Sequence, residues 1–402
     1  VIIVILVFVQ RIRLAIALNK VAARYLGNNP QTVLIPVAQS IVTLLWCLGW
    51  LMGASFLLSQ VPVDHSPSGY FETFEEAAGT GSTCTWFESS DDCAAGVPGE
   101  CTNKWPTGGV WKDKDCETDA EGVVKCWRCW QPRYVFDARF AMSFFVFLWN
   151  NAFMVALGQI LIAMCVGLWF FQTSENQQKR SVVFGAVRTI TRYHLGSVMF
   201  GSFIVAVVEF LRYVAKYYEK QAKAMKNQTA ALILKCVQCV LWCFEKFIQF
   251  LNKNAYIQIA LTGKDFIPAA KAAWFLILRN LLRFGTVAAL GRVVSAVGVT
   301  FIVCSTVFSG YMSLRAMHPD VYPFVPIVIY IIIGYVVARL FMTVFTLAVD
   351  TSLHCFMIVE EMGTSVENVP PELRHLVHHS QRLSKSPLAK GMSFAHTASA
   401  RE

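Results

Sequence analysis

The chain has 402 residues, of which 55% are hydrophobic and only 15% are charged. Soluble globular proteins carry about a quarter charged residues, so this composition excludes an ordinary soluble enzyme and indicates a protein of the lipid bilayer. The net charge of +9 does not indicate nucleic-acid binding, because the basic residues flank apolar runs, as they do in membrane proteins.

The apolar runs predict an all-α fold, a polytopic transmembrane helix bundle. A helix needs about 20 apolar residues to cross the hydrocarbon layer, and there it satisfies its own backbone groups. The expected spans are residues 33–59, 139–173, 293–315 and 324–350, and residues 1–10 are expected to be the end of a truncated span. The connecting segments are expected to be a cytoplasmic amphipathic segment at 11–32, a cytoplasmic loop at 174–192, an amphipathic helix at 262–292, an exoplasmic turn at 316–323 and a cytoplasmic tail at 351–402.

Residues 60–138 are expected to form an exoplasmic, disulfide-rich loop. Residues 60–137 hold 14 of the chain's 26 acids against six bases, whereas residues 1–59 contain bases and no acid. Positive charge beside a span is retained in the cytoplasm, so the acidic loop lies outside. An even set of cysteines in an oxidising compartment favours disulfides over a zinc site, although the spacing leaves the pairing open. The candidates are Cys84, Cys93, Cys101, Cys116, Cys126 and Cys129.

Residues 193–261 are expected to form a helical hairpin, and two membrane topologies are possible for it. If both helices cross the membrane, the turn lies outside and exposes Asn227, which begins the chain's one glycosylation sequon. If both stay on the cytoplasmic side, the many bases of the turn are retained there, as positive charge prefers. We expect the crossing pair, and Asn227 is the glycosylation candidate.

Polar and aromatic side chains inside apolar runs are the candidate functional residues. Trp149 and Phe153 are one turn apart, so they share a helix face that suits either a cation cage or plain helix packing. Glu209 suits a counter-ion or proton carrier, or else an ion pair with Arg212 three residues on. The sequence contains no signature of a catalytic, cofactor or metal site, so we do not expect an enzyme.

Several strings, in this order along the chain, make it similar to a known family. The strings are Arg11-Ile-Arg13, Leu148-Trp149 followed by Gln159, Arg192-Tyr193-His194, Trp242-Cys243-Phe244-Glu245-Lys246, Asn252-Lys253-Asn254-Ala255-Tyr256, Leu278-Arg279-Asn280 and Ala348-Val349-Asp350-Thr351. Over nearly all of residues 1–360 the chain resembles the choline transporter-like family, solute carriers that include the yeast pH nine-sensitive proteins. His354 stands where the family usually has an aliphatic or aromatic residue, and the family fills the position of Glu209 variably, so the resemblance assigns neither residue a role.

The resemblance implies a multi-pass protein, most simply of the plasma membrane, that takes up choline or a related organic cation or amino alcohol by alternating access without sodium. A quaternary ammonium is best held over aromatic faces, which suggests an aromatic cation site. The candidate substrate residues are Trp149, Phe153, Gln159, Tyr193, Glu209, Trp242 and Tyr256. The alternative is a non-transporting membrane scaffold or receptor that binds a partner through the exoplasmic loop. The sequence does not indicate the oligomeric state.

Overall fold

The structure, a computed structural model, describes the backbone of residues 2–60, 138–172, 182–224, 227–362 and 369–375, together with six short strands between residues 70 and 129. Side chains are described over residues 11–60, 138–172, 182–223, 227–361 and 369–375. The chain divides into a larger unit, Val1–Leu45 with Leu148–Glu402, and a smaller unit, Trp46–Phe147. Each unit is considered by itself below.

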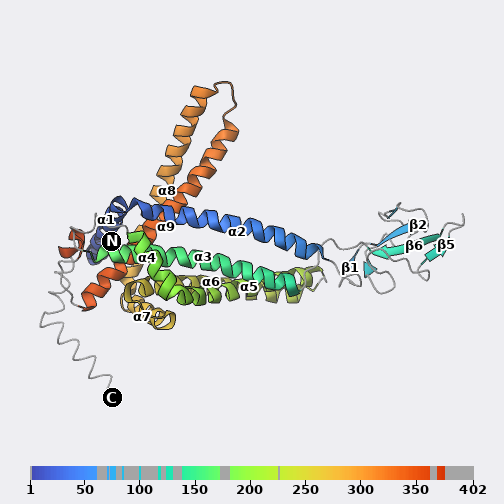
Figure 1. The fold of residues 1–402 in the computed structure, drawn as a ribbon, viewed down its shortest axis with the longest axis horizontal. Coiled ribbons are helices and arrows are strands. Elements are labelled where there is room, and N and C mark those ends of the chain that lie inside the picture. The colour runs from blue at the N-terminus through green and yellow to red at the C-terminus, as the bar shows by residue number, and fades with distance from the viewer. Residues whose placement is uncertain are drawn as a thin grey trace, which may run out of the picture. The chain divides into compact units, whose positions relative to one another are not determined.

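The expected all-α transmembrane helix bundle is confirmed. The helices are α1 (Ile2–Asn28), α2 (Leu34–Ser59), α3 (Ala138–Phe170), α4 (Val182–Thr189), α5 (Leu195–Ala224), α6 (Gln228–Thr262), α7 (Phe266–Arg279), α8 (Leu281–Met317) and α9 (Phe324–Met362). A 3-10 turn, η1 (Pro30–Val33), precedes α2, and a π-helical turn, η3 (Ile190–His194), joins α4 to α5 (Figure 1). Because α2 and α3 cross the unit boundary, the larger unit contains only part of each.

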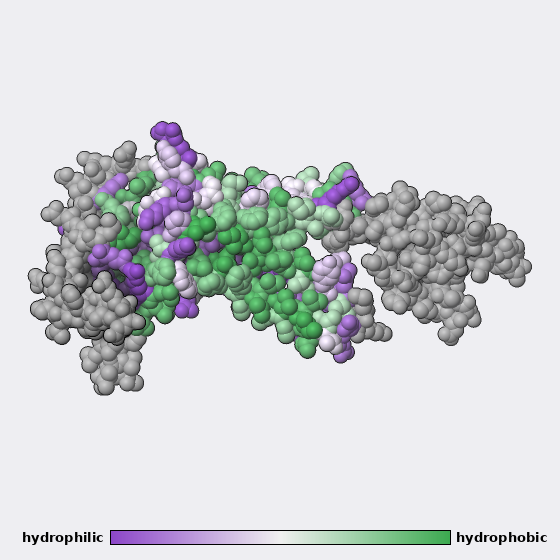
Figure 2. All heavy atoms as spheres, turned by 90° about the horizontal axis from the view of Figure 1, so that it is seen from below, coloured by the Kyte–Doolittle hydropathy of each residue, from purple (hydrophilic) through white to green (hydrophobic). Residues whose placement is uncertain are grey.

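Five helical stretches of the described residues are long and apolar enough to cross a membrane. They are Pro30–Ser59, Ala138–Phe170, Val182–Lys223, Leu281–Met317 and Phe324–Glu361. In the two C-terminal stretches only 11% of the most apolar window is buried inside the protein, so most of that surface needs lipid around it. Figure 2 shows apolar residues covering much of the visible described surface. The protein is therefore a multi-pass membrane protein.

The core of the larger unit forms where α1 packs against α8 and α9. The apolar face of α1 is fully buried at Leu18, Val21 and Tyr25, whereas its bases Lys20 and Arg24 stay exposed. Tyr25 packs edge-on against Trp169 of α3, with ring centroids 5.4 Å apart, and burial raises the pKa of its phenol. The segment therefore has one apolar face and one charged face, and the apolar face packs against other helices of the same chain.

The helices α5 and α6 pack along each other and form the hairpin expected from residues 193–261. Asn227 begins α6 as its N-cap, because its side-chain oxygen accepts a hydrogen bond from the Ala230 backbone N–H at 3.1 Å. Gly263 ends α6 at φ 69°, a left-handed conformation that glycine adopts without strain. The number of membrane crossings in this hairpin stays a prediction, as does glycosylation at Asn227.

Several helix boundaries differ from those expected. One helix, α1, runs through the boundary expected between residues 1–10 and 11–32. The amphipathic helix expected at 262–292 is divided at Asn280, whose side chain bonds the Leu276 carbonyl and so competes with continued helix. Most of the loop expected at 174–192 that is described forms α4, and α9 continues beyond the span expected at 324–350. Helix bounds follow local hydrogen bonding, which apolar content alone does not report.

The smaller unit contains the C-terminal part of α2, the first part of α3 and six strands. Trp50 of α2 stacks on Phe147 of α3 at 4.2 Å, and its Nε1–H lies 3.1 Å from the hydroxyl oxygen of Ser143. The strands are β1 (Tyr70–Phe71), β2 (Thr73–Ala77), β3 (Cys84–Thr85), β4 (Gly99–Glu100), β5 (Cys116–Thr118) and β6 (Val124–Cys129). They form an antiparallel β1–β4 pair and an antiparallel sheet in the order β3-β2-β6-β5, in which Cys116 is opposite Cys126. The side chains of the six disulfide candidates lie outside the described residues.

Candidate functional site

A cavity of about 360 Å³ lies among α3, α5 and α6 in the larger unit, and we call it the Glu209 cavity. Its volume falls within the range of small-molecule sites, about 300–1,000 Å³. Its lining is Asn151, Ala152, Val155, Ala156 and Gln159 of α3, Ser202, Val205 and Glu209 of α5, and Gln249, Asn252 and Tyr256 of α6. The lining therefore combines one carboxylate with amides, a hydroxyl, a phenol and aliphatic walls, and includes no base.

Glu209 faces this cavity without a basic partner among the described residues. Within the described residues Arg212 does not form the alternative ion pair with Glu209, because its Nε lies 2.9 Å from Glu245 Oε2; the charges of Arg212 and Lys246 still act on Glu209 from a longer distance. Glu245 is only 3% exposed, and its second oxygen accepts a hydrogen bond from Gln249 at 3.1 Å. A buried carboxylate holds the guanidinium more strongly than a half-buried one, since less water competes for it. Glu209 is thus left available for a cation in the cavity.

Two other polar atoms of the lining also have no hydrogen-bond partner within the described part of the chain. They are Asn151 Oδ1 and the Tyr256 hydroxyl, and both atoms are buried. A buried polar atom without a partner is costly, so such atoms in a cavity wall mark a place where water or a polar ligand binds. The Glu209 cavity therefore offers an unpaired charge and two unsatisfied polar groups.

The close contact of α5 with α6 at Gly201 positions Asn252 and Tyr256 in the cavity lining. Asn252 of α6 donates a buried hydrogen bond of 2.7 Å to the Gly201 carbonyl. A Cβ atom on Gly201 would clash with the Tyr256 hydroxyl and would lie 2.5 Å from a ring carbon of Phe266. Glycine is needed there because any side chain would displace Tyr256.

The structure brings three of the predicted substrate residues together, Gln159, Glu209 and Tyr256. Trp149 and Phe153 lie on the same helix as Gln159 but are not part of the cavity lining. Trp149 instead packs edge-on against Phe203 at 5.3 Å and its indole N–H donates to the Met199 carbonyl at 3.3 Å. Phe153 packs against the hydrophobic core.

Tyr193 and Trp242 lie apart from the cavity lining. Tyr193 belongs to the π-helical turn η3 and is 68% exposed, and Trp242 of α6 is 49% exposed. Ser202, Gln249 and Asn252 are cavity residues that the sequence reasoning did not select. Gln249 and Asn252 could have been found from their spacing. Together with Glu245 and Tyr256 they recur every three or four residues, which places one polar face along α6.

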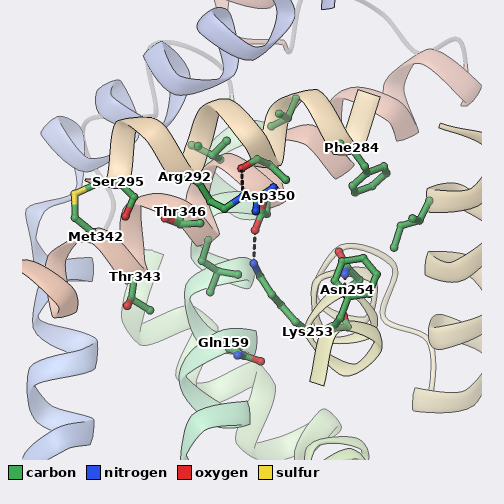
Figure 3. Close-up of a pocket in the computed structure, with 18 of the residues that line it drawn as sticks. Gln159, Lys253, Asn254, Phe284, Arg292, Ser295, Met342, Thr343, Thr346 and Asp350 are labelled. Atoms are coloured by element: carbon green, nitrogen blue, oxygen red, sulfur yellow. Dashed lines mark hydrogen bonds and ion pairs between the residues drawn. The ribbon is translucent and has the colours of Figure 1, made fainter. Parts of the chain in front are cut away.

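A second cavity, of about 590 Å³, lies among α3, α6, α7, α8 and α9, and we call it the basic cavity. Its charged residues are Lys253, Arg292, Arg339 and Asp350, so bases outnumber acids by three to one. Figure 3 shows the side chains of Lys253 and Asp350 pointing toward each other, and the two form an ion pair. Gln159 lines this cavity as well as the Glu209 cavity.

His354 supports the wall of the basic cavity from within the protein. It is fully buried, and its Nε2 lies 3.1 Å from Oδ1 of Asn254, a lining residue. Its ring packs edge-on against that of Phe284, another lining residue, at 5.3 Å. His354 therefore has a packing role at a position where the sequence departs from the family it resembles.

Comparisons with known proteins agree with this architecture. Residues 1–361 match the family described as "Plasma-membrane choline transporter". Choline transporter-like protein 2 of Dictyostelium discoideum is 34% identical over 213 residues, 53% of this chain and 34% of that protein. Choline transporter-like protein 2 of Pongo abelii is 29% identical over 396 residues, 94% of this chain and 52% of that protein.

Choline transporter-like protein 5 of Xenopus tropicalis is 32% identical over 254 residues, 60% of this chain and 36% of that protein. The chain thus spans about half the length, or less, of the curated relatives it matches. The family resemblance found in the sequence is confirmed, because the match to the family covers most of the chain. The chain belongs to the plasma-membrane choline transporter family.

Proposed function

We propose that this protein transports choline or a related organic cation across the plasma membrane, and that the cation binds in the Glu209 cavity. The observation that carries the proposal is an unpaired carboxylate facing a small cavity among three helices. A charge inside a membrane bundle is costly, so one without a protein partner is best explained by a charged ligand. Membership of the family supports choline as that ligand.

The lining suits the chemistry of choline. Its quaternary ammonium has no N–H to donate, so it is held by charge and by aromatic faces, here Glu209 and Tyr256. Its hydroxyl group needs a hydrogen-bond partner, which the unsatisfied Asn151 oxygen or the Gln159 amide supplies. The aliphatic residues Val155 and Val205 suit the methyl groups.

We further propose sodium-independent uptake by alternating access. The described lining holds a single carboxylate, which one monovalent cation neutralises, so a co-transported sodium has no carboxylate of its own. Trp149, Phe153, Tyr193 and Trp242 then serve the aromatic site only in a conformation in which the helices have moved. In such a cycle, the four aromatic residues contact the substrate in a different conformation from the one in which Glu209 binds it.

The test is radiolabelled choline uptake by proteoliposomes that contain the full natural chain. Glu209→Gln keeps the side-chain size and removes the charge, so kcat/KM falls about tenfold or more, equivalent to about 1.4 kcal/mol of lost binding. Glu209→Asp retains part of the uptake, because the charge remains.

The matched control is Glu361→Gln, which removes one carboxylate that is 49% exposed near the end of α9. Its uptake stays at the level of the unchanged protein. Equal uptake by the Glu209→Gln protein would refute the assigned site, and absence of saturable flux from the folded unchanged protein would favour a scaffold or receptor instead.

A further inference from the structure

The basic cavity has an excess of positive charge, which has no role in the proposed cation transport. Among its charged residues, Lys253 is paired with Asp350. Nearby, Arg283 lies 2.5 Å from Glu360, and Arg279 lies 3.7 Å from Glu361. Most bases of this region therefore have a carboxylate partner.

Arg292 and Arg339 are different, because neither has a carboxylate partner within the described part of the chain. Arg292 Nε donates only to the Ala288 carbonyl of its own helix, at 3.3 Å. Two uncompensated guanidinium groups repel a cation such as choline. The charge of this cavity therefore favours an anion over a cation.

Helix periodicity places both arginines on one cavity face with hydroxyl side chains. Arg292 and Ser295 are one turn apart on α8, and Arg339, Thr343 and Thr346 follow one face of α9. Figure 3 shows Arg292, Ser295, Thr343 and Thr346 around the same cavity. Guanidinium forks and hydroxyl donors together match the oxygens of a phosphate group.

The cavity is also open to its surroundings, because Arg292, Arg339 and Thr343 are exposed although they line it. Arg292 directly precedes the span expected at 293–315, at the end that charge placement assigns to the cytoplasm. Anionic phospholipids are concentrated in the cytoplasmic leaflet, and basic pockets among transmembrane helices bind their head groups. A phosphate group reaches this cavity either from that leaflet or from the cytosol.

We propose that the basic cavity binds a phosphate group through Arg292 and Arg339, presented by an anionic phospholipid or by a soluble phosphate compound. This site is separate from the proposed choline site and does not depend on it, since its charge has the opposite sign. Gln159 is the one residue that lines both cavities, so an occupied phosphate site contacts the wall of the Glu209 cavity.

The test measures the thermal stability of the purified full chain in detergent with four probes. These are dioctanoyl phosphatidic acid, dioctanoyl glycerol without phosphate, octanoate and inorganic phosphate. Phosphatidic acid raises Tm by about 3 °C or more at saturation, because a ligand that binds only the folded state stabilises it. Dioctanoyl glycerol and octanoate raise it much less.

The decisive variant is Arg292→Gln with Arg339→Gln, which loses most of the phosphatidic acid shift. The matched control is Lys264→Gln with Lys271→Gln, which removes the same charge from exposed positions outside the cavity and retains the shift. If the glutamine variant does not fold, Arg292→Lys with Arg339→Lys is used. Lysine keeps the charge without the planar fork, so the shift is reduced but present.

A shift with inorganic phosphate equal to that with phosphatidic acid supports the phosphate site and assigns it to soluble compounds. A shift with phosphatidic acid alone supports a lipid head group. Equal losses in the two double variants overturn the proposal, since they indicate general charge attraction. Equal shifts with dioctanoyl glycerol or octanoate overturn it too, because neither carries phosphate.

Discussion

The two cavities of the larger unit share a lining residue, Gln159, but differ in charge. The Glu209 cavity has one carboxylate and no base, whereas the basic cavity has three bases and one acid. In each cavity the available charge depends on which ion pairs form elsewhere. Arg212 binds Glu245 and leaves Glu209 unpaired, and Asp350 binds Lys253 and leaves two arginines unpaired. The comparison teaches that residue content sets the sign of each cavity's charge, and that the ion pairs determine which charged side chains remain available.

The largest expected effect comes from breaking the ion pair that keeps Arg212 away from Glu209. Glu245→Gln leaves Arg212, which is 29% exposed, without its ion-pair partner, and this destabilises the protein by about 3 kcal/mol, the low end of the range for buried pairs. Because Arg212 is then able to turn toward Glu209, three residues earlier, the negative charge of the Glu209 cavity is neutralised and choline uptake also falls. Denaturation in detergent and uptake in proteoliposomes measure the two effects.

A paired replacement separates loss of stability from loss of the site. In the protein with both Arg212→Met and Glu245→Met, neither member of this ion pair is left without its partner, so stability recovers to within about 1 kcal/mol. Uptake recovers with it because Glu209 is again without a basic partner. A double variant that stays as unstable as the single one contradicts this account.

A smaller effect is expected where α5 contacts α6. Gly201→Ala makes a Cβ atom clash with the Tyr256 hydroxyl, so the protein loses about 1–3 kcal/mol through overpacking. The KM for choline rises as well, because Tyr256 moves in the cavity wall, while binding at the basic cavity is unaffected. Thermal denaturation and uptake kinetics measure the change.

The control for this substitution lies on the same helix. A Cβ atom on Gly196 of α5 would have no neighbouring atom within 4 Å, so Gly196→Ala is neutral or stabilises the helix by about 0.5–1 kcal/mol. Removal of the Tyr256 hydroxyl in Gly201→Ala with Tyr256→Phe restores part of the lost stability. Equal behaviour of the Gly196 and Gly201 variants would show that the contact is not tight.

The smallest effect concerns the orientation of both cavities in the membrane. Asn227→Asp removes the sequon but keeps a good N-cap, so stability changes by less than about 0.5 kcal/mol. If the hairpin of α5 and α6 crosses the membrane, the unchanged protein expressed in eukaryotic cells carries a glycan that this variant lacks. A glycosidase-sensitive shift in gel mobility reports the difference, and its absence favours the cytoplasmic hairpin.

Most of the helices were predictable, because a stretch of about 20 apolar residues in lipid has few alternatives to helix. The break at Asn280 was not, since it depends on a side chain that competes for one backbone carbonyl. Within the site, Gln159 and Glu209 were predictable because polar groups in apolar runs are costly, and Tyr256 because an aromatic face suits a quaternary ammonium. Their common cavity was beyond prediction, since they come from three helices.

The sequence by itself determined that the protein is a helical membrane protein, that its acidic loop is expected outside, and which family it resembles. These properties depend on composition, charge placement and local strings, which are written along the chain. Only the tertiary structure decided that Arg212 binds Glu245, and that Glu209 faces a cavity unpaired. The physical reason is that an ion pair forms with the carboxylate that burial makes strongest, and burial depends on how helices pack.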